Sequence, residues 1–446
     1  MGRLGGMSGR RMGVDPAFGD PMSVDVVIPY YRDQRMLDRI VAALARQTGL
    51  ARPPRVIVAD DGSPTPPTVP PEVTVVRQDD RGFRASAARH LGASAGDGEV
   101  ILFLDGDTVP APGYVAALLA ALDQSPDLLV VGRRRYGRFA AADVSEPIEV
   151  LPDPAWPASF YAGTDDLTRD DGGWNAGLWR GVLSAVCGLH RRLYDLAGGF
   201  DPRIVGYGGE DWDLAWRCEQ VGGRLRYVPG AVAWHDGPDW SGRGEDDPGH
   251  VAQKNAETAR LARLIVSPLT RPSGGIFGVP LVAVHVHAGE RGSGADAAAC
   301  ASLVCWGDVS VTADPASSDA AEIAELFGAD PRVRLAARPR WWEPASQGAG
   351  PRRRPEVLID LLRPCALGAL DPGRLRALCP PVGMLTLDDD EGRVLARIRT
   401  SRALAREHLW GDRPGEPVVI HAADLGVTRF SADDAGVRLE RILGGW

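Results

Sequence analysis

The chain has 446 residues, of which 44% are apolar, enough to fill the cores of two or three globular domains. Its formal net charge of -9 argues against a protein that mainly binds nucleic acid, because neutralising phosphates requires an excess of cationic side chains. The six cysteines form no Cys-x-x-Cys pair, so reduced thiols and a cytoplasmic location are expected.

After residues 1–22, which are expected to form a flexible tail, short apolar runs alternate with helical patterns. Strands are expected at Val24–Ile28, Arg55–Ala59, Val73–Arg77, Val100–Leu104 and Leu128–Val131, and helices at Met36–Leu44, Arg84–Ala95 and Gly113–Leu122. The unbroken apolar run Val100–Leu104 is typical of a strand buried on both faces. This alternation predicts an α/β fold with a mainly parallel, Rossmann-like sheet flanked by helices.

The next segment, residues 133–180, shows no clear period and is predicted to be a long irregular lid or binding loop. Further elements are expected at Arg191–Ala197, Asp211–Val221 and Val251–Leu264 as helices, and at Leu225–Val228 and Ala231–Trp234 as strands. A Pro- and Gly-rich linker is placed at residues 269–278. The first domain is therefore assigned to residues 23–268.

Residues 279–446 are predicted to form an accessory α/β domain. Strands are expected at Leu281–His287, Val309–Ala313 and Val333–Ala336, separated by Ala-rich segments at 295–305 and 318–327.

Acidic residues follow two of the first domain's strands. Asp60 and Asp61 end one strand and Asp105-Gly106-Asp107 ends another, so a parallel sheet brings four carboxylates to one rim. Such carboxylates can hold Mg²⁺ or Mn²⁺ with positions left for phosphate oxygens. A solvated turn would explain Asp105-Gly106-Asp107 alone, but its place at the end of a buried strand favours the metal site.

Two arginines near this rim, Arg81 and Arg89, are candidate cationic donors to a nucleotide, although single arginines are commonly solvated surface groups. The carboxylates of Asp60 and Asp61 could accept hydrogen bonds from a base or ribose, but turn chemistry explains them nearly as well.

A second acidic cluster, Glu210 and Asp211, follows a glycine-dense turn. Acids at a helix start are often only caps. Here Tyr207 and Trp212 flank them and could stack on a sugar ring, while a carboxylate could deprotonate an attacking hydroxyl. His235, at the end of an expected strand, is a candidate metal ligand, although a lone histidine is usually a plain polar residue.

Taken in order, these residues resemble family 2 glycosyltransferases, which have the GT-A fold. The resemblance covers roughly residues 23–240 and is carried by six motifs: Val26–Tyr31, Val58–Ser63, Ala88–Gly92, Phe103–Asp107, Gly198–Asp201 and Gly208–Asp211. It implies transfer of a hexose from a nucleoside diphosphate sugar, UDP-linked by expectation, with inversion and with Mn²⁺ or Mg²⁺.

The resemblance also implies a role for each matching residue. Asp211 is the expected catalytic base and Glu210 contacts the acceptor, together with Tyr207, Gly209 and Trp212. The expected nucleotide-sugar contacts are Pro29, Asp60, Asp61, Arg81, Arg89, Asp105 and Gly106, and the expected metal ligands are Asp105, Asp107 and His235. The Gly-Gly-Glu-Asp form, with Tyr207 before it, is similar to the galactosyltransferase-like and chondroitin-polymerase-like branches.

The sequence departs from the family in two places. Ala185-Val186 replaces a usual Gly-Asn, and His90 stands where asparagine is usual. The identity of the donor sugar is therefore not inferred from any branch of the family. Residues 279–314 resemble the opening of a further GT-A unit that lacks its acidic motifs, which suggests a degenerate repeat. An unrelated α/β domain is the alternative.

Two other functions remain open at this point: a nucleotidyltransferase, and a catalytically inactive GT-A protein that binds carbohydrate. The expected partners are a nucleoside diphosphate sugar and a carbohydrate, lipid-linked or small-molecule acceptor, without nucleic acid. No apolar run approaches the about 18 residues of a membrane helix, and residues 1–21 lack the apolar core of a signal peptide. Any membrane association would then be peripheral, at the cytoplasmic face.

Overall fold

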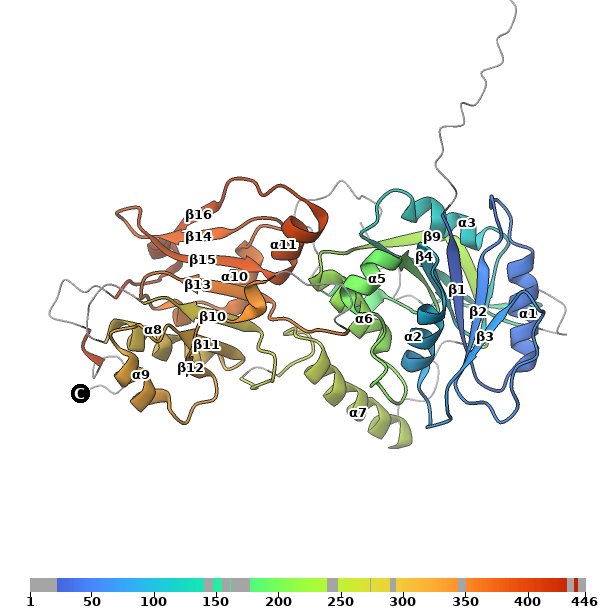
Figure 1. The fold of residues 1–446 in the computed structure, drawn as a ribbon, viewed down its shortest axis with the longest axis horizontal. Coiled ribbons are helices and arrows are strands. Elements are labelled where there is room, and N and C mark those ends of the chain that lie inside the picture. The colour runs from blue at the N-terminus through green and yellow to red at the C-terminus, as the bar shows by residue number, and fades with distance from the viewer. Residues whose placement is uncertain are drawn as a thin grey trace, which may run out of the picture.

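The computed structural model describes residues 22–139, 147–154, 161, 177–238, 248–272, 274–288, 294–343, 350–430 and 437–439. It contains two β-sheets, which lie in separate halves of an elongated molecule (Figure 1). The expected fold class, a mainly parallel sheet flanked by helices and followed by a C-terminal α/β domain, is confirmed. The expected N-terminal tail lies outside the described residues, apart from Met22.

The first sheet has the strand order β3-β2-β1-β4-β8-β6-β9-β5, with β7 paired to β6. Its strands are β1 (Val24–Tyr30), β2 (Arg55–Asp60), β3 (Thr74–Arg77), β4 (Val100–Leu104), β5 (Thr108–Pro110), β6 (Leu128–Arg138), β7 (Glu149–Leu151), β8 (Val186–His190) and β9 (Arg224–Asp236). Strands β1 to β4 pair in parallel, as does β6 with β9, whereas β8 runs antiparallel to β4 and β6. The carboxyl ends of β2 and β4 therefore share one edge, as predicted.

Helices pack against this sheet and complete the core. They are α1 (Gln34–Ala45), α2 (Ala85–Ala95), α3 (Tyr114–Leu122), α5 (Arg191–Ala197), α6 (Glu210–Gln220) and α7 (Pro248–Leu264), with a 3₁₀ turn at Leu178–Gly181. Helix α1 shows why they pack: Asp33 caps its first turn by accepting from the Met36 N–H, and Met36, Leu37, Ile40 and Leu44 form its buried stripe.

Three predictions within this domain were wrong. Residues 133–138 continue β6 instead of starting an irregular loop, and β8 lies in the middle of the sheet although no strand was expected there. The two strands expected at Leu225–Val228 and Ala231–Trp234 form one strand, β9, which bulges between Val228 and Val232 where its register with β6 shifts. The remainder of the predicted 133–180 loop, apart from 147–154, 161 and 177–180, lies outside the described residues.

The second sheet has the order β12-β11-β10-β13-β15-β14-β16. Its strands are β10 (Val282–Val286), β11 (Val309–Ala313), β12 (Val333–Leu335), β13 (Val357–Leu361), β14 (Leu385–Asp388), β15 (Val394–Thr400) and β16 (Val418–His421). The helices are α8 (Ala295–Leu303), α9 (Ala320–Phe327), α10 (Pro372–Leu378) and α11 (Ser401–Ala405), with short helical turns at Val304–Trp306, Arg340–Trp342, Leu367–Ala369, Arg406–Trp410 and Ala422–Leu425.

The two sheets share one topology. Strands β10, β11, β12 and β13 pair in parallel as β1, β2, β3 and β4 do, β15 is the antiparallel strand that corresponds to β8, and β14 pairs in parallel with β16 as β6 does with β9. Where β4 is followed by Asp105-Gly106-Asp107, the corresponding strand β13 is followed by Leu362-Arg363-Pro364. The second domain thus repeats the strand order of the first without its acidic motif, in agreement with the expected degenerate repeat.

Side chains of the second domain fix it against the first. Arg406 forms a buried ion pair with Asp127 and donates to the Gly222 carbonyl at 2.9 Å, and Trp410 Nε1 donates to the Val221 carbonyl at 2.7 Å. The predicted linker is anchored as well, because Arg271 Nη1 lies 2.8 Å from Asp308 Oδ2 in a buried ion pair. No helix in the described part of the chain is long and apolar enough to cross a bilayer.

Candidate active site

Strand pairing brings Asp107 against His235, although 127 residues separate them in the chain. Directly after Asp107, the short strand β5 pairs with β9 so that Thr108 lies opposite His235. The Asp236 N–H donates to the Asp107 carbonyl at 3.0 Å, and His235 Nε2 lies 3.4 Å from Asp107 Oδ2. The two side chains predicted from distant motifs therefore form one acid–imidazole pair at the carboxyl edge of the sheet.

The surroundings of this pair define its protonation. His235 Nδ1 lies 3.3 Å from the Gly237 carbonyl and Nε2 faces the Asp107 carboxylate, and both of these partners can only accept. Burial lowers the pKa of His235, but the bonds to Asp107 and Gly237 and the charge of Asp107 raise it above its usual value overall. Burial opposes ionisation of Asp107, yet the hydrogen bond and charge of His235 and the Thr108 hydroxyl lower the pKa of this carboxyl below its usual value. Asp107 is thus a carboxylate at neutral pH, and its side chain is 54% exposed.

The side chain of Asp105, the first acid of the same motif, pairs with Arg89 and not with His235. Its Oδ1 lies 2.5 Å from Arg89 Nη2, and its side chain is about half as exposed as that of Asp107. Among the residues that the structure describes, no three His, Cys, Asp or Glu side chains are grouped to hold a metal ion. Of the three predicted metal ligands, the structure brings together Asp107 and His235, while Asp105 pairs with the arginine.

Arg89 joins the two acidic motifs. This α2 side chain is 4% exposed, and its Nη1 lies 3.0 Å from Glu210 Oε1 while Nη2 binds Asp105. Burial opposes its charge, but the charges of Asp105 and Glu210 raise the pKa of Arg89, so it stays cationic. Arg89 was expected to contact a nucleotide, and in this structure it bridges the strand that carries Asp105 to the helix that carries Glu210.

The second motif sits on a turn that requires glycine. Gly206, Gly208 and Gly209 have φ between 87° and 92°, and a Cβ on Gly209 would lie 2.6 Å from Leu261 Cδ2. Helix α7 closes over this turn, with Arg260 donating to the carbonyls of residues 205, 207 and 208. The turn is thereby held in one conformation and fixes the direction in which α6 starts.

Helix α6 begins with the two predicted catalytic acids. Glu210 Oε2 is buried and accepts no hydrogen bond, while Asp211 Oδ1 accepts from the Trp212 N–H at 2.8 Å. Burial and the neighbouring Glu210 charge raise the pKa of Asp211 to about 7, against a smaller lowering effect of Arg89. Asp211 is therefore poised to accept a proton near neutral pH, as a general base must.

The predicted nucleotide-binding acids are both engaged. Asp60 is fully buried and holds its own turn, with Oδ1 accepting from the Ser63 N–H at 2.9 Å and Oδ2 paired to Arg77 at 3.2 Å. Asp61 accepts from Gln78 Nε2 at 2.6 Å and from the Arg84 N–H at 2.8 Å. Asp60 thus has a turn-forming role, and Asp61 links β2 to the start of α2.

Of the other predicted contacts, Gly106 lies against β1: a Cβ at this position would come within 2.8 Å of the Pro29 carbonyl. Only glycine allows the chain to pass so close to β1 before Asp107. Arg81 is not brought to these groups, because its 71% exposed side chain pairs with Asp79 on the same loop. In this structure Arg81 therefore does not contact the other residues predicted to bind the nucleotide.

Aromatic side chains stand beside the second motif. Tyr207 is 43% exposed and lies 5.8 Å from Phe83 between ring centroids, and the Gly206 N–H donates to the Phe83 carbonyl at 2.9 Å. Trp212 packs edge-on against Trp179 and lies 5.9 Å from Lys254 Nζ. The predicted pair of Tyr207 and Trp212 does flank Asp211, but Trp212 is partly covered whereas Tyr207 is open to solvent.

Sequence reasoning missed Arg134, on the part of β6 that was expected to be a loop. Its Nε donates to Tyr136 Oη at 3.0 Å, its charge contributes to lowering the pKa of Asp107, and Tyr136 packs 5.4 Å from His235. The available signal was the run Arg133–Arg135 directly after a buried apolar strand, where alternate side chains of a continued strand would face the same edge.

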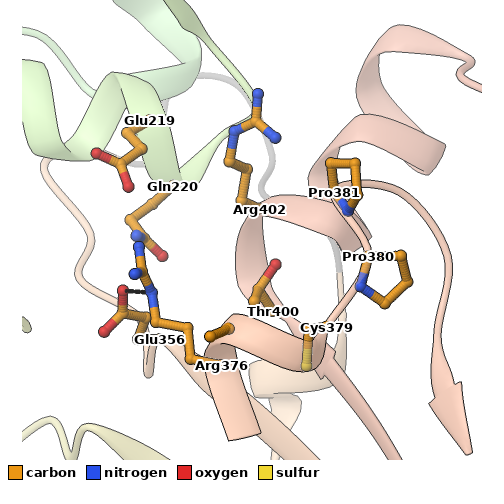
Figure 2. Close-up of a pocket in the computed structure, with 10 residues that line it drawn as sticks. Glu219, Gln220, Glu356, Arg376, Cys379, Pro380, Pro381, Thr400 and Arg402 are labelled. Atoms are coloured by element: carbon orange, nitrogen blue, oxygen red, sulfur yellow. Dashed lines mark ion pairs between the residues drawn. The ribbon is translucent and has the colours of Figure 1, made fainter. Parts of the chain in front are cut away.

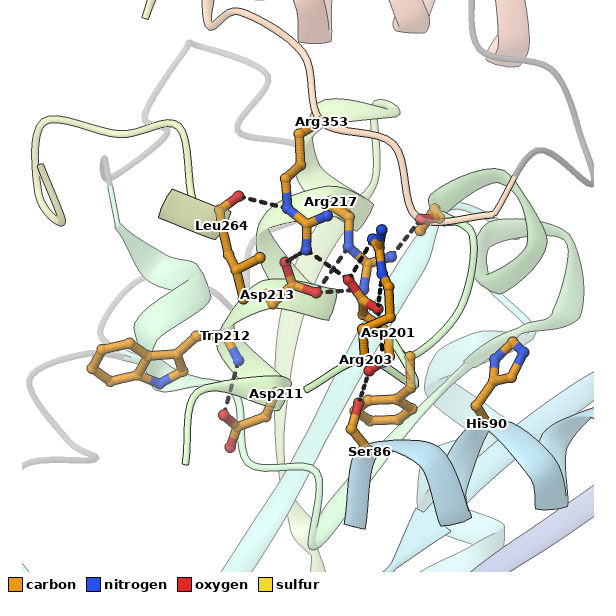
Figure 3. A network of polar contacts seen from close by, with 12 residues as sticks. Ser86, His90, Asp201, Arg203, Asp211, Trp212, Asp213, Arg217, Leu264 and Arg353 are labelled. Atoms are coloured by element: carbon orange, nitrogen blue, oxygen red, sulfur yellow. Dashed lines mark hydrogen bonds and ion pairs between the residues drawn. The ribbon is translucent and has the colours of Figure 1, made fainter. Parts of the chain in front are cut away.

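It also missed Arg353, which reaches α6 from the second domain (Figure 3). Arg353 Nη2 lies 2.7 Å from Asp213 Oδ1 and 3.0 Å from Asp201 Oδ2, and Nε donates to the Leu264 carbonyl at 2.8 Å. Arg217 binds the other oxygen of Asp213 at 2.7 Å. A cation of the second domain therefore holds the first turn of the helix that begins with Glu210 and Asp211.

The same network extends to the helix of Arg89. Ser86 Oγ, on α2, donates to the Asp201 carbonyl at 2.7 Å, and Asp201 is further bound by Arg203 at 2.8 Å (Figure 3). Asp201 thus connects α2, the loop before α6 and the second domain, which explains structurally why a buried aspartate follows Gly198–Phe200.

The chain is similar in sequence to known glycosyltransferases. Residues 25–170 match the family model described as glycosyl transferase family 2. Hyaluronan synthase of Pasteurella multocida is 24% identical over 368 residues, which cover 74% of this chain and 37% of that protein. Validoxylamine A glucosyltransferase of Streptomyces hygroscopicus subsp. limoneus is 32% identical over 224 residues, 45% of this chain and 48% of that protein.

A third relative, pre-mycofactocin glycosyltransferase of Mycobacterium tuberculosis, is 30% identical over 226 residues, which cover 48% of this chain and 42% of that protein. The chain therefore spans half or less of the length of each of these three relatives.

Proposed function

We propose that this chain, whose residues 25–170 match the model of glycosyl transferase family 2, transfers a hexose from a nucleoside diphosphate sugar, UDP-linked, to an acceptor hydroxyl or amine with inversion. The observation that carries the proposal is the joining of two acidic sites by Arg89: the exposed Asp107–His235 pair and the Glu210–Asp211 helix start. This chemistry requires stabilisation of a charged leaving group and a general base. The Asp107–His235 pair is proposed for the first requirement, and the Glu210–Asp211 helix start for the second.

Asp107 and His235 fit a divalent cation as a pair. Asp107 offers an exposed carboxylate, His235 would offer Nε2 after a cation displaces its proton, and the Gly237 carbonyl holds the imidazole by accepting from Nδ1. Mg²⁺ and Mn²⁺ accept such incomplete protein sites because substrate phosphate oxygens and water fill the other positions. When bound, the cation would supply charge stabilisation for the departing diphosphate.

On the other side, Asp211 is proposed to take the proton of the acceptor hydroxyl as its oxygen attacks the anomeric carbon. The Trp212 N–H orients the carboxylate, and the pKa of about 7 lets it act as a base near neutral pH. Attack from the face opposite the diphosphate inverts the anomeric carbon. Glu210 is proposed to contact a second hydroxyl of the acceptor, and the exposed ring of Tyr207 to pack on its sugar ring.

Similarity to a hyaluronan synthase, a chondroitin synthase and a validoxylamine A glucosyltransferase supports a carbohydrate or carbohydrate-like acceptor. Inversion, the UDP donor and metal dependence rest on the site chemistry and on the family resemblance.

Thermal unfolding with UDP, GDP and dTDP, each with and without Mn²⁺ or Mg²⁺, tests the proposal. We expect UDP to raise the Tm by several degrees only when metal is present, because a ligand at 100 times its Kd stabilises the fold by about 2.7 kcal/mol. Release of UDP from a UDP-sugar panel then identifies the donor, and release of pyrophosphate instead would indicate a nucleotidyltransferase. A Tm unchanged by every nucleotide–metal pair would contradict the proposal.

The rate of transfer should depend on pH through Asp211. The base form is the ionised carboxylate, and burial beside Glu210 raises its pKa to about 7, so kcat/KM should fall about tenfold per pH unit below 7 and level off above it. Initial rates of UDP release between pH 5.5 and 8.5, with melting curves at each pH to show that the fold persists, measure this. A flat profile down to pH 5.5 would remove Asp211 from the role of base.

A further inference from the structure

A pocket lies between the end of α6 and the second domain (Figure 2). Its cavity volume is about 280 Å³, near the lower limit of small-molecule sites. The polar residues that line it are Glu219, Gln220, Glu356, Arg376, Thr400 and Arg402. The rise of an α-helix places Gln220 about 14 Å from Asp211, so this interdomain pocket and the candidate active site lie at opposite ends of α6.

Two acceptors lie at this end of α6. Gln220 is 5% exposed, and its Oε1 is buried without a hydrogen bond. Glu219 is 7% exposed, and its carboxyl group interacts with the charges of Arg376, Glu356 and Arg402. Because burying an unpaired amide or carboxyl group costs free energy, a ligand that donates hydrogen bonds to both would stabilise the pocket.

The charges of the lining select the kind of ligand. Arg376 pairs with Glu356, as the dashed line in Figure 2 marks, and the charge of Arg402 acts on Glu219. Two guanidinium groups disfavour a cationic ligand, and two carboxyl groups disfavour an anionic one.

We propose that the interdomain pocket binds a neutral polyhydroxylated ligand, a single sugar unit, away from the candidate active site. Sugar hydroxyls both donate and accept, so one ring can donate to Glu219 and Gln220 while accepting from Arg402. The rings of Pro380 and Pro381 form an apolar wall for the C–H face of the sugar. The walls come from both domains, which Arg406 and Trp410 already fix together.

This proposal does not require that the chain be a transferase, because it concerns binding at a place that shares no residue with the Asp107–His235 pair or with Asp211. Nucleotide-dependent stabilisation and sugar binding at the pocket can therefore fail separately.

The test is ligand-observed NMR titration of the full chain with glucose, galactose, mannose, N-acetylglucosamine and N-acetylgalactosamine, with glucuronate and glucosamine as charged counterparts. We expect at least one neutral sugar to bind, and its Kd to weaken about tenfold in Gln220→Leu and in Glu219→Gln. Glu322→Gln, an exposed carboxylate on α9, is the matched control and should leave the Kd unchanged.

Melting curves of the variants accompany the titration, and two substitutions of different chemistry keep the test informative if one of them unfolds the chain. Absence of binding by every neutral sugar would overturn the proposal, as would preferred binding of glucuronate or glucosamine. Neutral-sugar binding that survives both pocket substitutions would place the ligand elsewhere and overturn it equally.

Discussion

Substitution of Asp211 by asparagine is expected to lower the rate of sugar transfer about 10³-fold while leaving metal-dependent UDP binding intact. Asparagine keeps the shape of the side chain, and its amide oxygen can still accept from the Trp212 N–H, but it cannot take a proton from the acceptor. Single-turnover assays of UDP release with acceptor, alongside thermal shifts with UDP and Mn²⁺, separate the two effects.

The stability of this variant gives an independent check. Because the folded-state pKa of Asp211 is raised, protonation favours the fold at low pH, and that contribution is lost as the pH rises through about 7. At pH 8 the wild-type fold is destabilised by the ionised, buried Asp211. The Tm of Asp211→Asn at this pH should therefore be no lower than that of the wild type. Asp123→Asn, at an exposed position at the end of α3, is the control for activity. Full transfer activity in Asp211→Asn would exclude this base.

The second large effect is expected at Asp107. Asp107→Ala should abolish the metal-dependent part of the UDP-induced rise in Tm and lower transfer by about 10²- to 10³-fold, since charge stabilisation of a leaving diphosphate is worth several kcal/mol. His235 would remain as a single neutral nitrogen facing the site. Thermal shifts over a Mn²⁺ titration at fixed UDP concentration measure the loss.

The other acid of the motif supplies the contrast. Asp105 Oδ1 binds buried Arg89, so Asp105→Asn should lower the Tm of the free protein, because a buried guanidinium loses one of its two charged partners. It should nevertheless retain a metal-dependent shift with UDP. An equal loss of that shift in both variants would show that the two acids hold the cation jointly, contrary to the separation seen in the structure.

Local patterns predicted much of this architecture from the sequence. The acidic motifs at the ends of β2 and β4 were placed on one edge because side chains after parallel strands must meet there. The helices α5 and α6 and the strand β11 were placed within a residue of their observed bounds, since their apolar periods are strong. These features depend on residues that are close in the chain.

What the sequence did not reveal depends on partners far away in the chain. Strand β8 has only five residues and lies buried between β4 and β6, so its short apolar run carries no alternation to identify it. Arg89 was assigned to a nucleotide because nothing local shows that Asp105 and Glu210 will enclose its guanidinium. Arg353 lies 140 residues from Asp213, beyond any periodicity argument.

The contact made by Arg353 also bears on the order in which the molecule can be completed during synthesis. Asp201 and Asp213 leave the ribosome well before Arg353. The ion pairs that Arg353 makes with them therefore cannot form until the segment just before β13 has been made. A chain ending at the 269–278 linker would carry every residue proposed here for chemistry, yet its base would start from an incompletely anchored helix. The half of the chain that lacks the acidic motif thus supplies a cation that holds the helix bearing Glu210 and Asp211 in the other half.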